Sequence, residues 1–193
     1  MKQHKDKSIV VAVALVFVGA FTRLLDHLPN FSPMEAIALF GGAYLTSKLA
    51  AYLVPLVAIF LSDLVLNNTI MRPFFSDKEG LVIFDGYMIY NIIGMVAIVA
   101  IARVLLKKVS AGKVLGGSLI ASSVFFVVTN IGSWLSLPIY SKDVSGLVTA
   151  MTAGIPFFNT SWISTLLFSC VLFGTFELYT RFQSSLIPAR QKA

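Results

Sequence analysis

The chain has 193 residues, of which 57% are hydrophobic and 12% are charged, and its mean hydropathy is +0.85. These values lie well outside the range of a soluble domain of this size and predict an integral membrane protein. The net charge of +6 could suggest a nucleic-acid partner, but the basic residues cluster beside apolar segments, so none is expected. The single cysteine, Cys170, excludes a disulfide framework within one chain.

The apolar segments predict one all-α domain over residues 1–193, with six membrane-spanning helices. A helix rises 1.5 Å per residue and needs about 20 residues to cross a ~30 Å hydrocarbon core. The first apolar run lacks a convincing small-residue cleavage site, so we expect a retained anchor and not a signal peptide. The predicted spans cover residues 8–25, 33–47, 49–66, 84–106, 114–135 and 155–179.

Prolines shape the expected connections. Pro29 and Pro33 forbid a continuous helix, which predicts a structured outer loop and a second helix that starts at Pro33. This second span is short and can cross only if it is tilted or starts partly inside the protein. Pro55 predicts a kink in the third span. We also expect residues 145–154 to form a short surface helix that ends at Gly154.

The distribution of charge predicts the orientation. With a cytoplasmic N-terminus, only four of the fifteen basic residues fall on the outer side. This bias favours six spans with both termini in the cytoplasm, as expected for a bacterial inner-membrane protein. Most acids fall at or near the outer side, so the polar chemistry should lie there. The four outer basic residues are Arg23, Arg72, Lys78 and Lys142.

Four distant stretches should meet in this outer layer: residues 23–35, 62–73, 129–140 and 156–162. A polar group in lipid usually pairs, faces water or holds a ligand, because it otherwise costs several kcal/mol. An apolar hollow with a few convergent polar groups is typical of small-molecule sites. The candidate ligand-binding residues are Arg23, Asp26, His27, Asn30, Glu35, Asp63, Asn91, Asn130, Trp134, Phe158 and Asn159.

Each candidate also has a structural interpretation. Arg23 should pair with Asp26, Glu35 or Asp63, either as a structural bridge or as a binding group. Glu35 falls in the first turn of its helix, where the dipole alone favours a carboxylate. His27 is either a metal ligand or base, or a solvated loop residue. Trp134 fits the aromatic belt at the headgroups as well as a ligand contact, and the asparagines could simply connect helices.

No sequence motif for catalysis or nucleotide binding is present. Gly116 and Gly117 lack the phosphate-loop spacing and its Lys-Ser/Thr ending. The chain has no Gly-x-Ser-x-Gly elbow and no His-Glu-x-x-His pair. We therefore assign no catalytic residue, metal ligand or cofactor, do not expect an enzyme, and expect any energy input to come from elsewhere.

Several sequence elements carry a resemblance to known proteins. The run of residues 28–44, with Leu61-Ser-Asp-Leu64 and Gly154-Ile-Pro-Phe-Phe158, resembles a family of small uncharacterised bacterial inner-membrane proteins. The six-span layout is more distantly similar to the substrate-capture (S) components of energy-coupling factor (ECF) vitamin transporters. This resemblance implies a small-molecule solute bound under the outer loops, beside membrane lipid, and a possible partner module with an ATPase.

Two residues depart from the S-component pattern. Members that dock onto a shared transmembrane partner typically carry Ala-x-x-x-Ala in the first helix, whereas here Val16 stands four residues after Ala12. Cobalamin-transporting members ligate cobalt through a cysteine, but Cys170 lies within a span. The departures leave docking open and disfavour cobalamin.

Three functions remain open from the sequence. The first is capture and uptake of a small vitamin-like or cationic solute. The second is a membrane scaffold or assembly factor without a ligand. The third is an intramembrane enzyme that uses Asp26, His27 and Asp63, which requires these side chains to lie within hydrogen-bond reach of one another.

Overall fold

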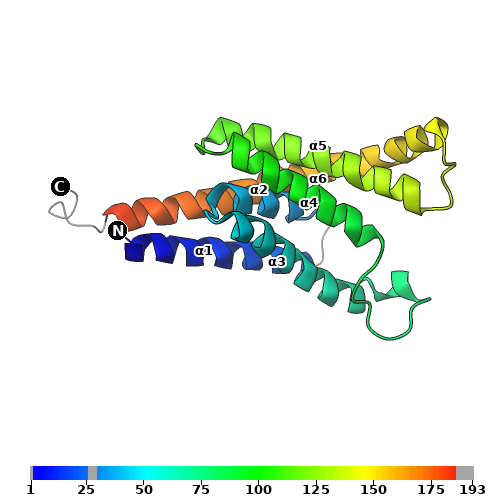
Figure 1. The fold of residues 1–193 in the computed structure, drawn as a ribbon, viewed down its shortest axis with the longest axis horizontal. Coiled ribbons are helices and arrows are strands. Elements are labelled where there is room, and N and C mark those ends of the chain that lie inside the picture. The colour runs from blue at the N-terminus through cyan, green and yellow to red at the C-terminus, as the bar shows by residue number, and fades with distance from the viewer. Residues whose placement is uncertain (1, 26–29, 186–193) are drawn as a thin grey trace.

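A computed structural model describes the backbone of residues 2–25 and 30–185, and side chains from residue 8 onward within these ranges. The described residues form six α-helices and two short 3-10 helices and contain no strand, which confirms the predicted all-α class (Figure 1). The helices in chain order are α1 (Lys2–Phe21), η1 (Thr22–Leu24), α2 (Met34–Tyr44), α3 (Lys48–Asn68), η2 (Arg72–Phe75), α4 (Tyr87–Leu105), α5 (Ala111–Ser136) and α6 (Val144–Ser185).

Four of these helices, α3, α4, α5 and α6, are long and apolar enough to cross a membrane, in agreement with the predicted membrane protein. The apolar part of the first helical segment, Ser8–Leu24, is shorter. The helices run lengthwise beside one another, and the start of α1 and the end of α6 lie at the same end of the bundle (Figure 1). We call this the terminal end and the other the cavity end.

The centre of the bundle is occupied by α2. Its first nine residues, Met34 to Gly42, are all buried, and it contacts α1, α3, α4, α5 and α6. Its 11 residues span only about 17 Å, so it cannot cross a ~30 Å core. The segment that was predicted to be the second span is therefore a buried helix of about half that length. It begins at Met34 with Pro33 as its N-cap, as expected.

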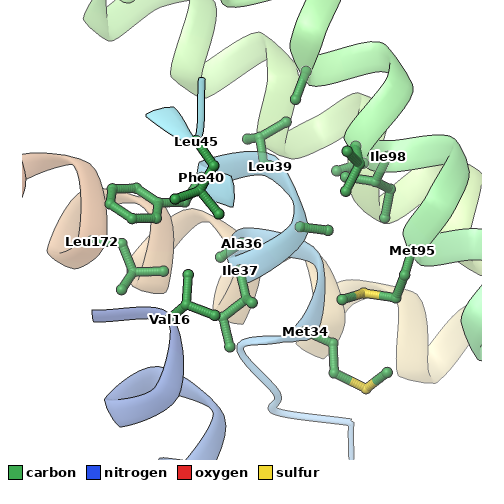
Figure 2. Close-up of a cluster of buried hydrophobic side chains, with 14 of the residues drawn as sticks. Val16, Met34, Ala36, Ile37, Leu39, Phe40, Leu45, Met95, Ile98 and Leu172 are labelled. Atoms are coloured by element: carbon green, nitrogen blue, oxygen red, sulfur yellow. The ribbon is translucent and has the colours of Figure 1, made fainter. Parts of the chain in front are cut away.

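Large and small side chains surround α2. Figure 2 shows Val16 of α1, Met95 and Ile98 of α4, and Leu172 of α6 around α2. A Cβ on Gly42 would lie 2.7 Å from the Cβ of Ala102 and 2.8 Å from the carbonyl oxygen of Val99. The glycine therefore allows the backbones of α2 and α4 to approach closely.

A single helix of 42 residues, α6, replaces two predicted elements. The expectation of a separate surface helix over residues 145–154 is wrong, because those residues are the first turns of α6. Gly154 does not end a helix. A glycine that ends a helix commonly has a positive φ angle, and among the described residues only Asn30 and Gly80 have one. Its missing side chain instead leaves room for the Asn130 amide of α5. Pro156 lies inside the helix.

Candidate functional site

A cavity of about 1210 Å³ opens at the cavity end of the bundle. Its lining comes from η1 and the residue after it, the start of α2, the end of α3, η2, the start of α4, the end of α5 and the first half of α6. All four stretches expected to meet in the outer layer contribute to it. Sites for small molecules commonly measure about 300–1,000 Å³, so the hollow is large enough for one.

The start of α2 forms part of the cavity wall, through Ser32, Met34 and Glu35. The backbone N–H of Ser32 donates to Ser164 Oγ at 3.3 Å, and that hydroxyl donates to the Ser32 carbonyl at 3.1 Å. This pair of contacts fixes the start of α2 against α6. Asn30, also in the lining, has a φ of 59°, a left-handed conformation that asparagine tolerates better than most residues.

Arg23 and Asp63 form a buried ion pair in the cavity wall. Arg23 Nη2 lies 2.7 Å from Asp63 Oδ1, and the two side chains are 11% and 5% exposed. Arg23 Nη1 also donates to Ser62 Oγ at 2.6 Å. Of Glu35 and Asp63, the two described acids considered for Arg23, the structure pairs it with Asp63, while Asp26 lies outside the described residues. Removing one partner of such a pair leaves an uncompensated buried charge, which is costly.

Glu35 lies in the first turn of α2 and is 2% exposed. Ser161 of α6 donates its hydroxyl to Glu35 Oε1. Within residues 8–25 and 30–185, no basic side chain forms an ion pair with Glu35. The helix N-terminus favours a carboxylate at this position, as the capping interpretation anticipated. Unlike Asp63, Glu35 thus lines the cavity without a direct ion pair to a described residue, and the charge of Arg23 reaches it only at longer range.

Asparagine side chains add further polar groups to the wall. Asn91 lies in the lining, and its amide makes no hydrogen bond to any described residue. Asn130 Nδ2 donates to the Phe126 carbonyl at 2.7 Å, and the side chain packs against Gly154. Phe158 also lines the cavity, with its ring centroid 5.2 Å from that of Phe126. These contacts place an amide beside an aromatic pair.

Asn67 and Tyr87 were not predicted as site residues. Tyr87 Oη donates to Asn67 Oδ1 at 3.0 Å, and both residues line the cavity. Asn67 stands four residues after Asp63 on α3, and this spacing puts two side chains on one helix face. This four-residue spacing is the feature of the sequence that could have predicted Asn67 as a site residue. Ser161 was also missed as an individual residue, although its stretch was expected in the layer.

Several predicted site residues lie elsewhere. Trp134 and Asn159 do not line the cavity. Trp134 Nε1 instead donates to the Ser141 carbonyl at 2.8 Å, and Asn159 is exposed on α6. Asp26 and His27 lie outside the described residues, so the proximity that an intramembrane enzyme would need is not tested.

The segment between α3 and α4, residues 69–86, covers one side of the cavity and contributes Met71, Phe74 and Phe75. Asn68 fastens it, because Nδ2 donates to the Val82 carbonyl at 3.0 Å and Oδ1 accepts the Val82 N–H at 2.8 Å.

A second contact in this segment joins Lys78 to Asp85 in an ion pair. The hydrogen bond from Lys78 lowers the pKa of the Asp85 carboxyl below its usual range. The Lys78–Asp85 ion pair therefore joins two parts of this segment to each other, and the Asn68 amide joins the segment to α3.

The fold and the cavity define a helical membrane protein with a hollow, partly polar site at one end. The chain belongs to DUF6580, a family of unknown function, whose model matches residues 3–188. This match agrees with the expected membership of an uncharacterised family. No curated protein and no solved structure matches the chain. The similarity to vitamin-transporter S components stays a prediction.

Proposed function

We propose that this protein binds a small vitamin-like or cationic solute in the cavity and takes part in its uptake across a bacterial inner membrane. The observation that supports this function best is the cavity itself. Elements far apart in sequence converge there and bring a buried ion pair, a buried carboxylate and free amides to one hollow. Lined mostly by apolar residues, it has the composition common in small-molecule sites.

The short central helix also supports a transport function. In many transporters, interrupted helices end inside the protein at the substrate site, where irregular backbone is tolerated because it lines a cavity. Here α2 begins at the cavity wall and the chain before it, at Asn30 and Ser32, is non-helical and lines the same hollow. The arrangement fits a solute that enters to the depth of the helix start.

A partner module remains part of the proposal, but one candidate docking face is covered. Ala12 and Val16, the positions that correspond to the docking element of S components, are both fully buried within the chain. A partner that docks on α1 would have to use the opposite side, where Val10 and Val18 are exposed. Uptake without an ECF-type module is therefore equally compatible with this fold.

The scaffold alternative rests on the Arg23–Asp63 pair, which can tie η1 to α3 without any ligand. A pure scaffold gains nothing from a large void, because unfilled space forfeits packing contacts. The size of the cavity therefore favours capture over a scaffold.

The experiment is a thermal-shift screen of the purified protein against vitamins, amines and metal ions, followed by uptake into proteoliposomes. A ligand at a hundred times its Kd stabilises the folded state by about 2.7 kcal/mol. We expect one compound class to raise Tm. If no compound in a broad panel does so, the capture function is wrong and the scaffold alternative stands.

Two asparagines provide a matched pair of variants. Asn91→Ala removes an amide from the cavity wall without breaking a described hydrogen bond, so folding should be retained and ligand binding weakened. Asn159→Ala removes an exposed amide that does not line the cavity and should change neither. Equal effects of the two variants on binding would place the ligand outside this cavity.

The proposal also includes an orientation, with the cavity end outside and both termini in the cytoplasm. In a Cys170→Ala background, Asp77→Cys, at an exposed position between α3 and α4, should react with an impermeant thiol reagent added to intact cells. Lys108→Cys, in the connection between α4 and α5 at the terminal end, should react only after lysis. The reverse pattern would place the cavity in the cytoplasm.

A further inference from the structure

The charged groups of the cavity narrow the class of ligand. Three ionisable side chains of the described residues carry charge in its lining: Arg23, Glu35 and Asp63. With all three ionised, the wall has one net negative charge. An inference about the ligand depends on which of these charges is already neutralised within the protein.

The positive groups are already engaged. Arg23 uses one nitrogen on Asp63 and another on Ser62, at 2.7 and 2.6 Å. The partial positive charge at the start of α2 faces the carboxylate of Glu35 in its own first turn. An anionic ligand would therefore meet positive groups whose charge is already neutralised by Asp63 and Glu35.

The negative groups are not equally engaged. Asp63 is neutralised by direct contact with Arg23, whereas Glu35 accepts a hydrogen bond from Ser161 and interacts with the Arg23 charge only at longer range. At 2% exposure Glu35 is also almost fully withdrawn from solvent. A buried carboxylate is costly to keep ionised without a cation beside it. Glu35 is thus the group in the wall that a positively charged ligand would complete.

We propose that the ligand is an organic monocation, a protonated amine attached to an apolar or aromatic body, whose ammonium group binds Glu35. This inference rests on the proposed function and narrows its solute class. Glu35 and Ser161 both offer oxygen acceptors, which suits an ammonium with N–H donors better than a quaternary one.

The remaining lining fits the body of such a molecule. The rings of Phe126 and Phe158 meet in the wall, and aromatic faces attract both apolar groups and cations. Asn91 and Asn130 present amide oxygens that accept no hydrogen bond from a described residue. They can receive a second donor of the ligand and so fix its orientation.

The test uses three probes of similar shape on the full chain in detergent: phenethylamine, 3-phenylpropionate and 3-phenylpropanol. We expect the amine to raise Tm. The anion and the neutral alcohol should need at least tenfold higher concentrations to give the same rise in Tm. Glu35→Gln should weaken amine binding at least tenfold. Glu79→Gln, at an exposed acid outside the lining, should leave amine binding unchanged.

A second pair of variants tests the class without altering Glu35, in case Glu35→Gln does not fold. Asn91→Lys places a fixed positive charge in the cavity and should abolish amine binding, whereas Asn159→Lys on the exposed surface should not. Both variants carry the same side chain, so a general effect of the added charge would appear in both.

The outcomes separate this inference from the proposed function. Amine binding that is unchanged in Glu35→Gln overturns the cation assignment. So does stronger binding of the anion or the alcohol, but if that binding is lost in Asn91→Ala the capture function still stands. If the amine does not bind in this series, the proposed ligand class is wrong. If the broad screen finds no ligand at all, both the ligand class and the capture function are wrong.

Discussion

The two ends of α2 differ in how the surrounding helices meet it. At its C-terminal end, the Phe40 ring packs against Tyr44, Phe173 and Phe176, with ring centroids 5.0 to 5.6 Å apart. At its N-terminal end the same helices diverge from it around about 1210 Å³ of space. The first end is filled by rings, whereas the second is a hollow lined by apolar side chains and a few polar ones.

This contrast follows from the length of α2. Because it occupies only part of the bundle's length, the helices around it have a central partner at the terminal end and none at the cavity end. Rings at the cavity end stay exposed, with Phe74 at 76% and Phe157 at 48%. Residues around the C-terminal half of α2 should therefore control stability, and residues around its start should control binding.

The largest expected effect comes from emptying the packed end. Phe40→Ala removes a fully buried ring from the aromatic cluster and should lower the free energy of unfolding by about 3–5 kcal/mol, because the remaining void lacks packing contacts. Phe74→Ala, at the cavity, is the matched control and should change it by less than about 0.5 kcal/mol. Unfolding by sodium dodecyl sulfate in mixed micelles measures both. Similar losses in the two variants would contradict the contrast.

A smaller effect should follow from overfilling the same end. Gly42→Ala places a Cβ against the backbone of α4, which cannot move cheaply, and should cost about 1–3 kcal/mol. In Gly116→Ala of α5 the new Cβ meets no atom within 4 Å, so the better helix propensity of alanine should leave stability unchanged or slightly raised. The same unfolding assay compares them. A neutral Gly42→Ala would mean that α2 and α4 are less closely packed.

A single hydrogen bond at the terminal end should contribute less. Tyr44 Oη donates to Glu177 Oε1 at 2.5 Å and so joins the end of α2 to α6. Tyr44→Phe keeps the ring contacts and should cost about 1 kcal/mol, the usual net value of such a bond. Tyr52→Phe, at a tyrosine whose hydroxyl has no described partner, should have no effect. Melting curves of the two variants at one pH provide the comparison, and equal Tm values would argue against the bond.

Much of the contrast could be predicted from the sequence, because it depends on charge and on proline. Pro33 indicated where α2 begins, and the unequal distribution of basic and acidic residues indicated which end holds the polar groups. The convergence of four stretches at one end followed from alternating spans. Asp63 was one of the three acids expected to pair with Arg23, and the structure joins the two.

The remaining features depend on tertiary packing that local patterns do not contain. Gly154 and Pro156 are helix-ending signals, yet α6 continues through both, and Gly154 serves instead to admit the Asn130 side chain of α5. Asn159 and Ser161 lie in one stretch, but only Ser161 faces the cavity, since two residues differ by about 200° around a helix.

The smallest expected effect concerns the segment over the cavity and depends on pH. Lys78 lowers the pKa of Asp85, so the ion pair adds stability above the pKa that Asp85 has in the unfolded chain, and this stability is lost as pH falls through the lower folded value. Both side chains are partly exposed, so the loss should be at most about 1 kcal/mol. Acidification should therefore loosen residues 69–86 before the rest of the bundle, because the packed end around Phe40 does not depend on Asp85.

Hydrogen exchange of this segment between pH 7 and pH 3, corrected for the intrinsic pH dependence of exchange, measures the effect. In Asp85→Asn the segment should already exchange faster at pH 7 and show no further step. A step that persists in this variant would assign the pH dependence to another group.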